Sequence, residues 1–161
     1  MFTNEQFTDL AKKYIDTVFR VALGYTKNPS DAEDVTQNVF LALLQTKKEF
    51  ETEDHIRYWL IRVTVNECKK LFRSPWRAVA SLEEYAQTLS FETKTHSELF
   101  YAVMALPTKY RMPIYLFYYE EYSTEEIANI LRLPKGTVCT NLKRGREKLK
   151  KFLQEEGLCN G

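Results

Sequence analysis

The sequence contains little glycine, proline, cysteine or histidine. Five glycines and five prolines in 161 residues leave few positions for tight turns, which favours long helices. Three cysteines without a CxxC pair and two histidines provide no recognisable zinc site, so neither a metal nor another cofactor is expected. The N-terminal residues lack the basic and apolar regions of a secretion signal. Together with the unpaired cysteines, this is typical of a cytoplasmic protein.

Long apolar runs and catalytic motifs are also missing. Apolar runs such as residues 39–44 are too short to cross a bilayer, so no direct membrane insertion is expected. There is no Walker loop, GxGxxG, HExxH or GxSxG motif, and an enzyme is therefore not expected. The 44% of hydrophobic residues is enough for a packed core and excludes a wholly disordered chain.

Capping-box patterns, in which Ser or Thr is followed three residues later by Glu or Gln, mark five expected helix starts and are mostly followed by helical periodicity. They are Thr3/Gln6, Ser30/Glu33, Ser81/Glu84, Thr95/Glu98 and Ser123/Glu126. We therefore predict an all-α protein of two small helical domains, residues 1–73 and 96–155. A flexible linker, 74–95, joins them and contains one short helix at about 82–89; residues 156–161 form a tail.

Apolar stripes at helical spacing indicate the core of the first domain. After Ser30 the stripe is Val35, Val39, Leu43 and Thr46, widened by Phe40 and Leu44; from about residue 56 it is Ile56, Leu60, Val63 and Leu71, with Trp59. In the second domain, Pro113 is expected either in the first turn of a helix or at a kink.

Residues 122–155 have the pattern of a helix-turn-helix. A short capped helix at 123–131 is followed by a turn that contains Pro134 and then by a longer helix. The inward stripe of the longer helix is Val138, Leu142, Gly145, Leu149 and Phe152. Because glycine has no side chain, Gly145 is expected to allow a close approach of a neighbouring helix.

The opposite side of the longer helix is strongly basic. Residues 132–151 contain eight Lys or Arg and one acidic residue, Glu147. Short polar groups near the helix N-terminus suit base edges, and cations further along suit phosphates. A solvated basic face is the alternative, but the preceding helix and turn favour DNA binding. The predicted contacts are Lys135, Thr137, Thr140, Asn141, Lys143, Arg144 and Lys148, with Thr140, Lys143 and Arg144 the best candidates for reading bases.

The first domain has a second basic face, on the helix predicted near 56–73. Its members are Arg62, Asn66, Lys69 and Arg73, with Lys70 beside them. Asn66 lies between cations and could read a base, although an asparagine within a helix usually faces solvent. Trp59 could stack on an unpaired base or join the core.

Several motifs resemble those of one family. Residues 31–40 resemble region 2 of the sigma-70 family of RNA polymerase sigma factors, and 59–66 resemble its promoter-opening segment. Residues 106–111, 123–128 and 136–138 resemble region 4. The presence of only these two domains resembles the extracytoplasmic-function (ECF) group. The resemblance implies a region 2 helical bundle, a region 4 helix-turn-helix, and a protein that binds core RNA polymerase and directs promoter-specific initiation.

The resemblance also implies roles for residues. Core polymerase would be bound by Asp31, Asp34, Gln37, Asn38 and Phe40. The −10 element would be captured and melted by the 50–55 loop and by Trp59, Arg62, Asn66, Lys69, Lys70 and Arg73, and the −35 duplex would be read by the predicted helix-turn-helix contacts. The aromatic stretch 110–119 would form core and partly meet the polymerase flap. An anti-sigma factor is a further implied partner.

Two other functions remain open at this point. A stand-alone helix-turn-helix regulator would bind operators without polymerase, but would need neither the Asn66 face nor the 31–40 surface. A polymerase-binding helical adaptor without DNA binding is kept open by departures from the family pattern: acids at 51–54, and Cys139 and Asn141 at positions that are usually basic. Cys139 could act as a redox switch or be an ordinary small residue.

Overall fold

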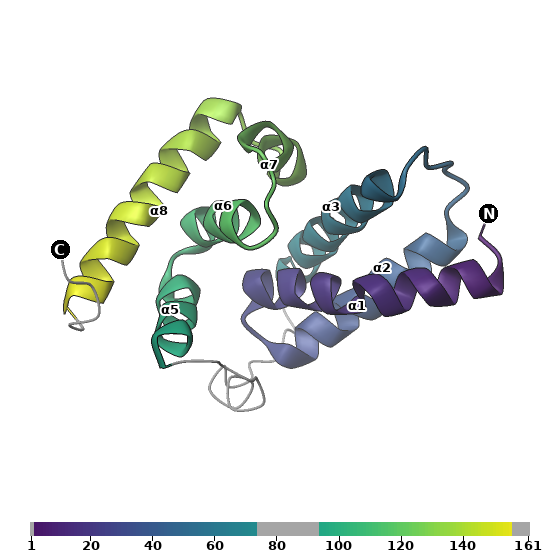
Figure 1. Ribbon diagram of the computed structural model, residues 1–161, viewed down its shortest axis with the longest axis horizontal. Helices are drawn as coiled ribbons and strands as arrows, with labels where there is room; N and C mark the ends of the chain where they lie inside the picture. The colour runs from purple at the N-terminus through teal and green to yellow at the C-terminus, as the bar shows by residue number, and fades with distance from the viewer. Residues whose placement is uncertain (1, 74–93, 156–161) are drawn as a thin grey trace. The chain divides into compact units, whose positions relative to one another are not determined.

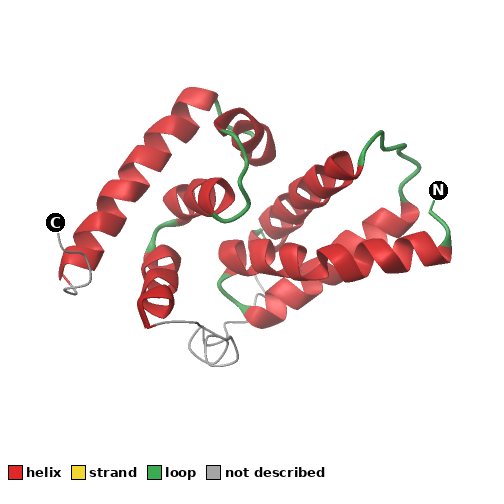
Figure 2. Ribbon diagram, in the orientation of Figure 1, coloured by secondary structure: helices red, strands yellow, loops and turns green. Residues whose placement is uncertain are grey.

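A computed structural model describes residues 2–73 and 94–155, which form two compact helical units (Figure 1). The N-terminal unit contains α1 (Asn4–Thr26), α2 (Pro29–Gln45) and α3 (Glu53–Phe72). The C-terminal unit contains α5 (Lys94–Ala105), α6 (Thr108–Tyr118), α7 (Thr124–Leu131) and α8 (Lys135–Glu155). Figure 2 shows helices and loops but no strand in these ranges, and the all-α prediction is confirmed. Within them, no helix is long and apolar enough to cross a membrane.

Two of the predicted capping boxes are present. The Thr3 hydroxyl accepts a hydrogen bond from the Gln6 backbone N–H at 3.1 Å, and the Gln6 side chain accepts one from the Thr3 N–H at 2.9 Å. Ser123 and Glu126 make the same reciprocal pair at the start of α7, at 3.1 and 3.0 Å. Each box satisfies two backbone donors that the helix itself cannot pair.

The other helix starts differ from the prediction. α2 begins before Ser30, because the Asn28 side chain caps it by accepting from the Asp31 N–H at 3.0 Å, and Pro29 suits the first helical position. α3 begins at Glu53 rather than near residue 56, since Thr52 caps it by accepting from the His55 N–H at 3.2 Å. α5 begins at Lys94, which places Thr95 inside the helix. The Ser81/Glu84 box and the 82–89 helix lie outside the described residues.

The N-terminal unit packs α1, α2 and α3 against one another. Val35, Val39 and Leu43 of the predicted α2 stripe are buried, with Leu60 and Ile61 on α3. Leu44, however, is exposed, so its expected inward position is wrong. Leu44 follows Leu43 by only one residue, and one residue turns a helix by more than a quarter of a circle.

The C-terminal unit packs α8 against α5, α6 and α7. Val138 and Leu142 are buried as predicted, and Gly145 is buried against α6. A Cβ atom placed on Gly145 would lie 2.8 Å from Ile114 Cγ1, so a glycine is needed for this close contact. Pro113 lies inside α6, beyond the first turn, where it cannot donate the usual hydrogen bond to the Lys109 carbonyl.

Candidate nucleic-acid interface

α7, a tight turn and α8 form the helix-turn-helix that the sequence predicted. α7 ends at Leu131, and Arg132 follows in the left-handed conformation (φ 57°), with its N–H bonded to the Ala128 carbonyl. The Leu133 N–H also donates to that carbonyl, at 3.0 Å. These two bonds hold the turn in which the chain changes direction before α8 begins at Lys135. The turn thus uses one residue in a conformation that non-glycine residues rarely adopt.

The outward side of α8 is exposed and basic. Its exposed members include Thr137, Thr140, Lys143, Arg144, Lys148 and Lys151. The buried Val138, Leu142 and Gly145 hold the opposite side against α6 and α7, which fixes the rotation of the helix about its axis. The cations therefore form a convex row that a phosphate backbone could approach.

Asn141 differs from its prediction. The sequence placed it on the outward side, but it is only 8% exposed. It follows the buried Val138 by three residues and precedes Leu142, so it lies at the border of the inward stripe. Its expected exposure is therefore wrong.

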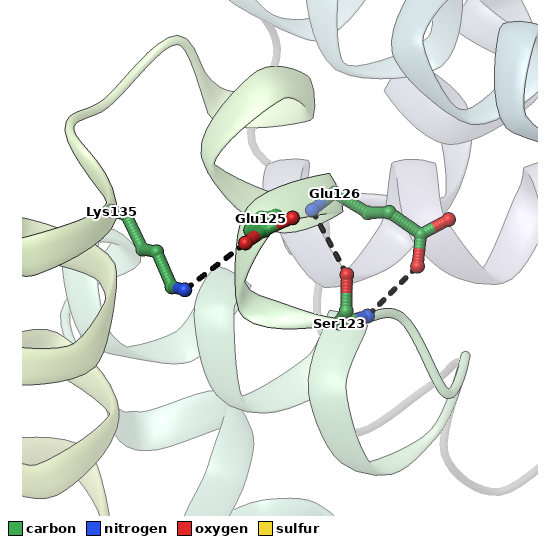
Figure 3. A network of polar contacts seen from close by, with 4 residues as sticks. All are labelled: Ser123, Glu125, Glu126 and Lys135. Carbon is green, nitrogen blue, oxygen red and sulfur yellow. Dashed lines mark hydrogen bonds and ion pairs between the residues drawn. The ribbon is translucent and has the colours of Figure 1, made fainter.

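Lys135 begins α8 and contacts α7 directly. Its Nζ lies 3.1 Å from Glu125 Oε1, beside the capping box of Ser123 and Glu126 (Figure 3). Both side chains of this ion pair are more than half exposed, so the pair adds little stability. A DNA phosphate would have to compete with the Glu125 carboxylate for this lysine.

On α3, the predicted basic face is less exposed. Arg62, Asn66 and Lys69 are half-buried, whereas Lys70 and Arg73 are exposed. Lys70 Nζ forms an ion pair with Glu67 Oε1 at 3.2 Å. This face therefore differs from the row of long exposed cations on α8.

A cavity of about 200 Å³ lies where α3 meets the preceding loop. Trp59 forms part of its wall, with Phe50 edge-on to the Trp59 ring at a centroid distance of 5.6 Å. Arg62 lies over the Tyr58 ring, 5.9 Å from its centroid. The residues that line the cavity are Lys48, Glu49, Phe50, His55, Tyr58, Trp59 and Arg62. Aromatic rings beside cations have the chemistry needed to hold one unstacked base.

Sequence reasoning did not identify Lys48 or Glu49 as members of this cavity. They belong to the loop after α2, and only the folded loop brings them to α3. The aromatic residues Phe50, Tyr58 and Trp59 were the available signal, because three aromatic residues close together beside basic residues are typical of single-strand binding.

The acids at 51–54 have a structural explanation. Glu53 and Asp54 lie in the first turn of α3, where negative charge is favourable. Glu53 Oε2 also accepts a hydrogen bond from Lys13 Nζ on α1 at 2.7 Å, and this bond raises the pKa of Lys13. Glu53 and Asp54 thus stabilise the start of the helix, and Glu53 connects it to α1.

The polymerase-contact residues predicted on α2 fall into two groups. Asp34, Gln37 and Asn38 are exposed on one side of the helix. Asp31 and Phe40 are only 5% and 8% exposed and do not belong to this side, which for Phe40 agrees with its place in the predicted apolar stripe. Asp31 lies at the capped helix start, and Phe40 packs edge-on against Phe7 of α1 at 6.5 Å.

Leu41 continues the exposed side of α2. It is 52% exposed and follows Gln37 by four residues and Asn38 by three, so the three side chains lie on one side of the helix. Leu44 extends this side by another turn. The sequence indicated Leu44 as core, so this apolar continuation of the polar surface was missed.

Family models match both units. The Sigma-70 region 2 model matches residues 10–78, and the Sigma-70 region 4 model matches residues 96–149. The chain is 27% identical to the ECF RNA polymerase sigma factor SigW of Bacillus subtilis, over 94% of this chain and 90% of that protein. It is 28% identical to the ECF sigma factor SigE of Mycolicibacterium smegmatis, over 90% of this chain and 60% of that protein.

A solved structure has the same fold. The sigma factor RpoE of Bartonella quintana, in complex with the anti-sigma factor NepR, matches with a TM-score of 0.69 at 20% identity, over 92% of this chain and 96% of that one. The two family models lie in the order region 2, region 4 and together cover most of the chain. The chain therefore belongs to the sigma-70 family, in its ECF group, and is an RNA polymerase sigma factor that directs transcription initiation.

Proposed function

We propose that the two units divide promoter recognition between them. Residues 1–73 would bind core polymerase and capture the −10 element, residues 96–155 would read the −35 duplex, and residues 74–95 would link them, with 156–161 as a tail. The observation that carries this proposal is the contrast between the convex basic row on α8 and the aromatic cavity beside α3. The first suits a duplex, and the second suits a base that has left the stack.

At the −35 element, α8 would lie in the major groove. Thr137, Thr140, Lys143 and Arg144 are exposed near its N-terminal half, where base edges would be reached, and Lys148 follows one turn after Arg144 for a phosphate. Lys135 would exchange its Glu125 partner for a phosphate. Asn141 would contribute only after a change of rotamer, because the side chain is buried.

At the −10 element, the cavity beside α3 would accept one flipped base. Trp59 and Phe50 offer ring faces or edges, and Arg62 lies at the wall next to Tyr58. Asn66, one turn further along α3, would contact a base edge, while Lys69, Lys70 and Arg73 would follow the strand phosphates. Single-strand capture avoids the cost of reading a base inside the duplex, because the flipped base exposes all its edges.

Core polymerase would bind the exposed side of α2 formed by Asp34, Gln37, Asn38, Leu41 and Leu44. Polar residues beside an exposed leucine are typical of a protein contact surface, because the apolar centre supplies affinity and the polar residues supply orientation. Asp31 and Phe40 would support this surface from the interior rather than touch the partner.

Substitution of Leu41 by Ser tests this surface. We expect about a tenfold loss of affinity for core polymerase, measured by fluorescence titration, because a buried interface leucine would be replaced by a polar group. Ile15→Ser is the matched control, since Ile15 is also an exposed aliphatic residue but lies on α1. Equal losses for the two variants, or none for Leu41→Ser, would contradict the α2 assignment.

The C-terminal unit offers a second protein contact. An apolar cavity of about 500 Å³ is lined by Leu99, Val103, Ile114, Tyr118, Tyr119, Arg146, Leu149, Lys150 and Leu153. The aromatic stretch 110–119 has a buried part and an exposed part. Tyr110 is buried in the unit, whereas Tyr118 and Tyr119 are about half exposed at this cavity. We assign the exposed part to the polymerase flap and the buried part to the core.

An anti-sigma factor is the last proposed partner. The chain itself would act in the cytoplasm and would not catalyse a reaction. The support is the similarity in fold to a sigma factor whose structure was solved with its anti-sigma factor. Co-purification of the chain with a protein that lowers its transcription activity in vitro would establish this partner. Transcription that is unchanged by every co-purified protein would refute it.

Run-off transcription tests the function as a whole. Promoters would first be located by mapping the transcripts induced when the chain is overexpressed. We expect specific transcripts from these promoters when the chain is added to core polymerase, and none with core polymerase alone. A protein that binds the promoters but yields no polymerase-dependent transcript would be a stand-alone regulator. One that binds polymerase without promoter-dependent transcription would be an adaptor.

A further inference from the structure

Tyr110, near the start of α6, lies among three cations from two helices. Its ring centroid is 5.0 Å from Lys109 Nζ on the same helix and 5.5 Å from Lys148 Nζ on α8. The close helix contact at Gly145 makes this approach possible, because a Cβ atom at that position would lie only 3.5 Å from Tyr110 Cβ. The tyrosine thus extends from α6 to the basic row of α8.

The surroundings of the Tyr110 hydroxyl are positive. The neighbouring Lys109 is the largest cause that lowers the pKa of Tyr110 from its ordinary value, and Arg144 lowers it further, while burial acts in the opposite direction. In the described ranges, no ion pair involves Lys109, Arg144 or Lys148. The cations around Tyr110 are therefore not neutralised by a carboxylate, and two of them lie over its ring.

We propose that Tyr110 is a positioning residue for duplex recognition: its ring holds the Lys148 ammonium in line on α8, and Lys109, over the same ring, adds a phosphate contact from α6. This inference rests on the proposed −35 role of α8. Long cationic side chains lose conformational freedom when they bind a phosphate. A tyrosine that already restricts two of them lowers that cost, which is the general benefit of preorganisation.

The competing explanation is that Tyr110 is only part of the core, since it is 7% exposed. Two substitutions separate the explanations. Tyr110→Phe removes only the hydroxyl and keeps the ring, so the contacts with Lys109 and Lys148 remain. Tyr110→Leu removes the ring face, so both contacts are lost.

The experiment measures the affinity of the full chain for a short mixed-sequence DNA duplex by fluorescence anisotropy, over a series of KCl concentrations and below the melting temperature of every variant. We expect Tyr110→Leu to bind about threefold more weakly, the size of one exposed cation–π contact. Tyr110→Phe should bind like the wild type, because it keeps the ring. In a Lys109→Ala/Lys148→Ala background, Tyr110→Leu should cause no further loss. If Tyr110→Leu caused the same loss in that background as in the wild type, the positioning role would be overturned, because a structural defect would persist there.

The matched control is Tyr14→Leu. Tyr14 is also 7% exposed and also has a lysine over its ring, Lys13 at 5.5 Å, but it lies on α1 in the other unit. Its substitution should leave duplex affinity unchanged. If Arg144→Ala and Lys148→Ala themselves have no effect on affinity, the −35 role of α8 fails and this inference fails with it. If they weaken binding while Tyr110→Leu matches the wild type, only the positioning role is refuted.

Discussion

α3 and α8 both present cations to solvent, but they present them in different ways. On α8, Lys143, Arg144 and Lys148 are exposed along a convex row opposite a buried stripe. On α3, Arg62 and Lys69 are half-buried, and Arg62 lines a cavity with aromatic residues. A duplex presents regularly spaced phosphates outside, whereas an unstacked base needs a concave site with ring faces. In our proposal, the same residue types would therefore serve two kinds of nucleic-acid recognition, depending on local shape.

The largest expected effect concerns Arg144 on the basic row of α8. Arg144→Ala should weaken −35 duplex binding by about 1–3 kcal/mol for the preferred sequence and much less for other sequences, because a base contact is lost. Binding to a panel of duplexes with single base changes, measured by fluorescence anisotropy, tests this.

Lys148→Ala is the companion variant on the same row. It should weaken all the duplexes alike and reduce the slope of log affinity against log salt by about one, because one phosphate contact is removed. If Arg144→Ala also weakened every sequence equally, Arg144 would be a phosphate contact and not a base-reading residue.

The second prediction concerns how α8 is held in place. Gly145→Ala should lower the free energy of unfolding by about 1–2 kcal/mol, because the added Cβ would lie 2.8 Å from the buried Ile114 side chain. Urea denaturation followed by circular dichroism measures this change.

Gly136→Ala, on the first turn of the same helix, is the matched control. Nothing lies within 4 Å of a Cβ atom at that position. This substitution should be neutral or stabilise the protein by up to about 1 kcal/mol, because alanine favours helix. A Gly145→Ala variant as stable as Gly136→Ala would show that Ile114 moves aside without cost.

The third prediction, with the smallest effect, concerns Asn66 on α3. Asn66→Ala should leave −35 duplex binding unchanged and reduce the fraction of open promoter complexes about fivefold, the size of one hydrogen bond. Permanganate reactivity of unpaired thymines in the holoenzyme complex measures opening. Unchanged reactivity would remove Asn66 from the melting step, and weakened duplex binding would contradict the division of roles between the helices.

Much of the fold follows from local patterns. The boxes at Thr3/Gln6 and Ser123/Glu126 start helices as predicted, and the Val138–Leu142–Gly145 stripe is buried. Such features depend on residues within about one or two turns, so the chain itself specifies them. The start of α2 was predicted at Ser30, but Asn28 provides the N-cap and Pro29 is the first helical residue, so the helix begins earlier.

The site residues were predicted less completely than the fold. Asp31 and Asn141 were expected to be at the surface, and Phe40 was expected both in the apolar stripe and in a polymerase contact; all three are buried. Each lies near the edge of an apolar stripe, where the packing of the neighbouring helix decides between core and surface. For Phe40 that neighbour is Phe7 on α1. Leu44 was expected in the core but is exposed, because none of the described helices covers it enough to bury it.

The sequence by itself determined the all-helical class, the helix-turn-helix and the basic side of α8, because periodicity and capping act over a few residues. The tertiary structure alone decided which charged and aromatic residues lie together. It brings Lys48 and Phe50 to the wall that contains Trp59, and it places Tyr110 beside Lys148, 38 positions along the chain. These groupings depend on how helices pack, which is set by the close contact at Gly145 and by the path of the loop after α2.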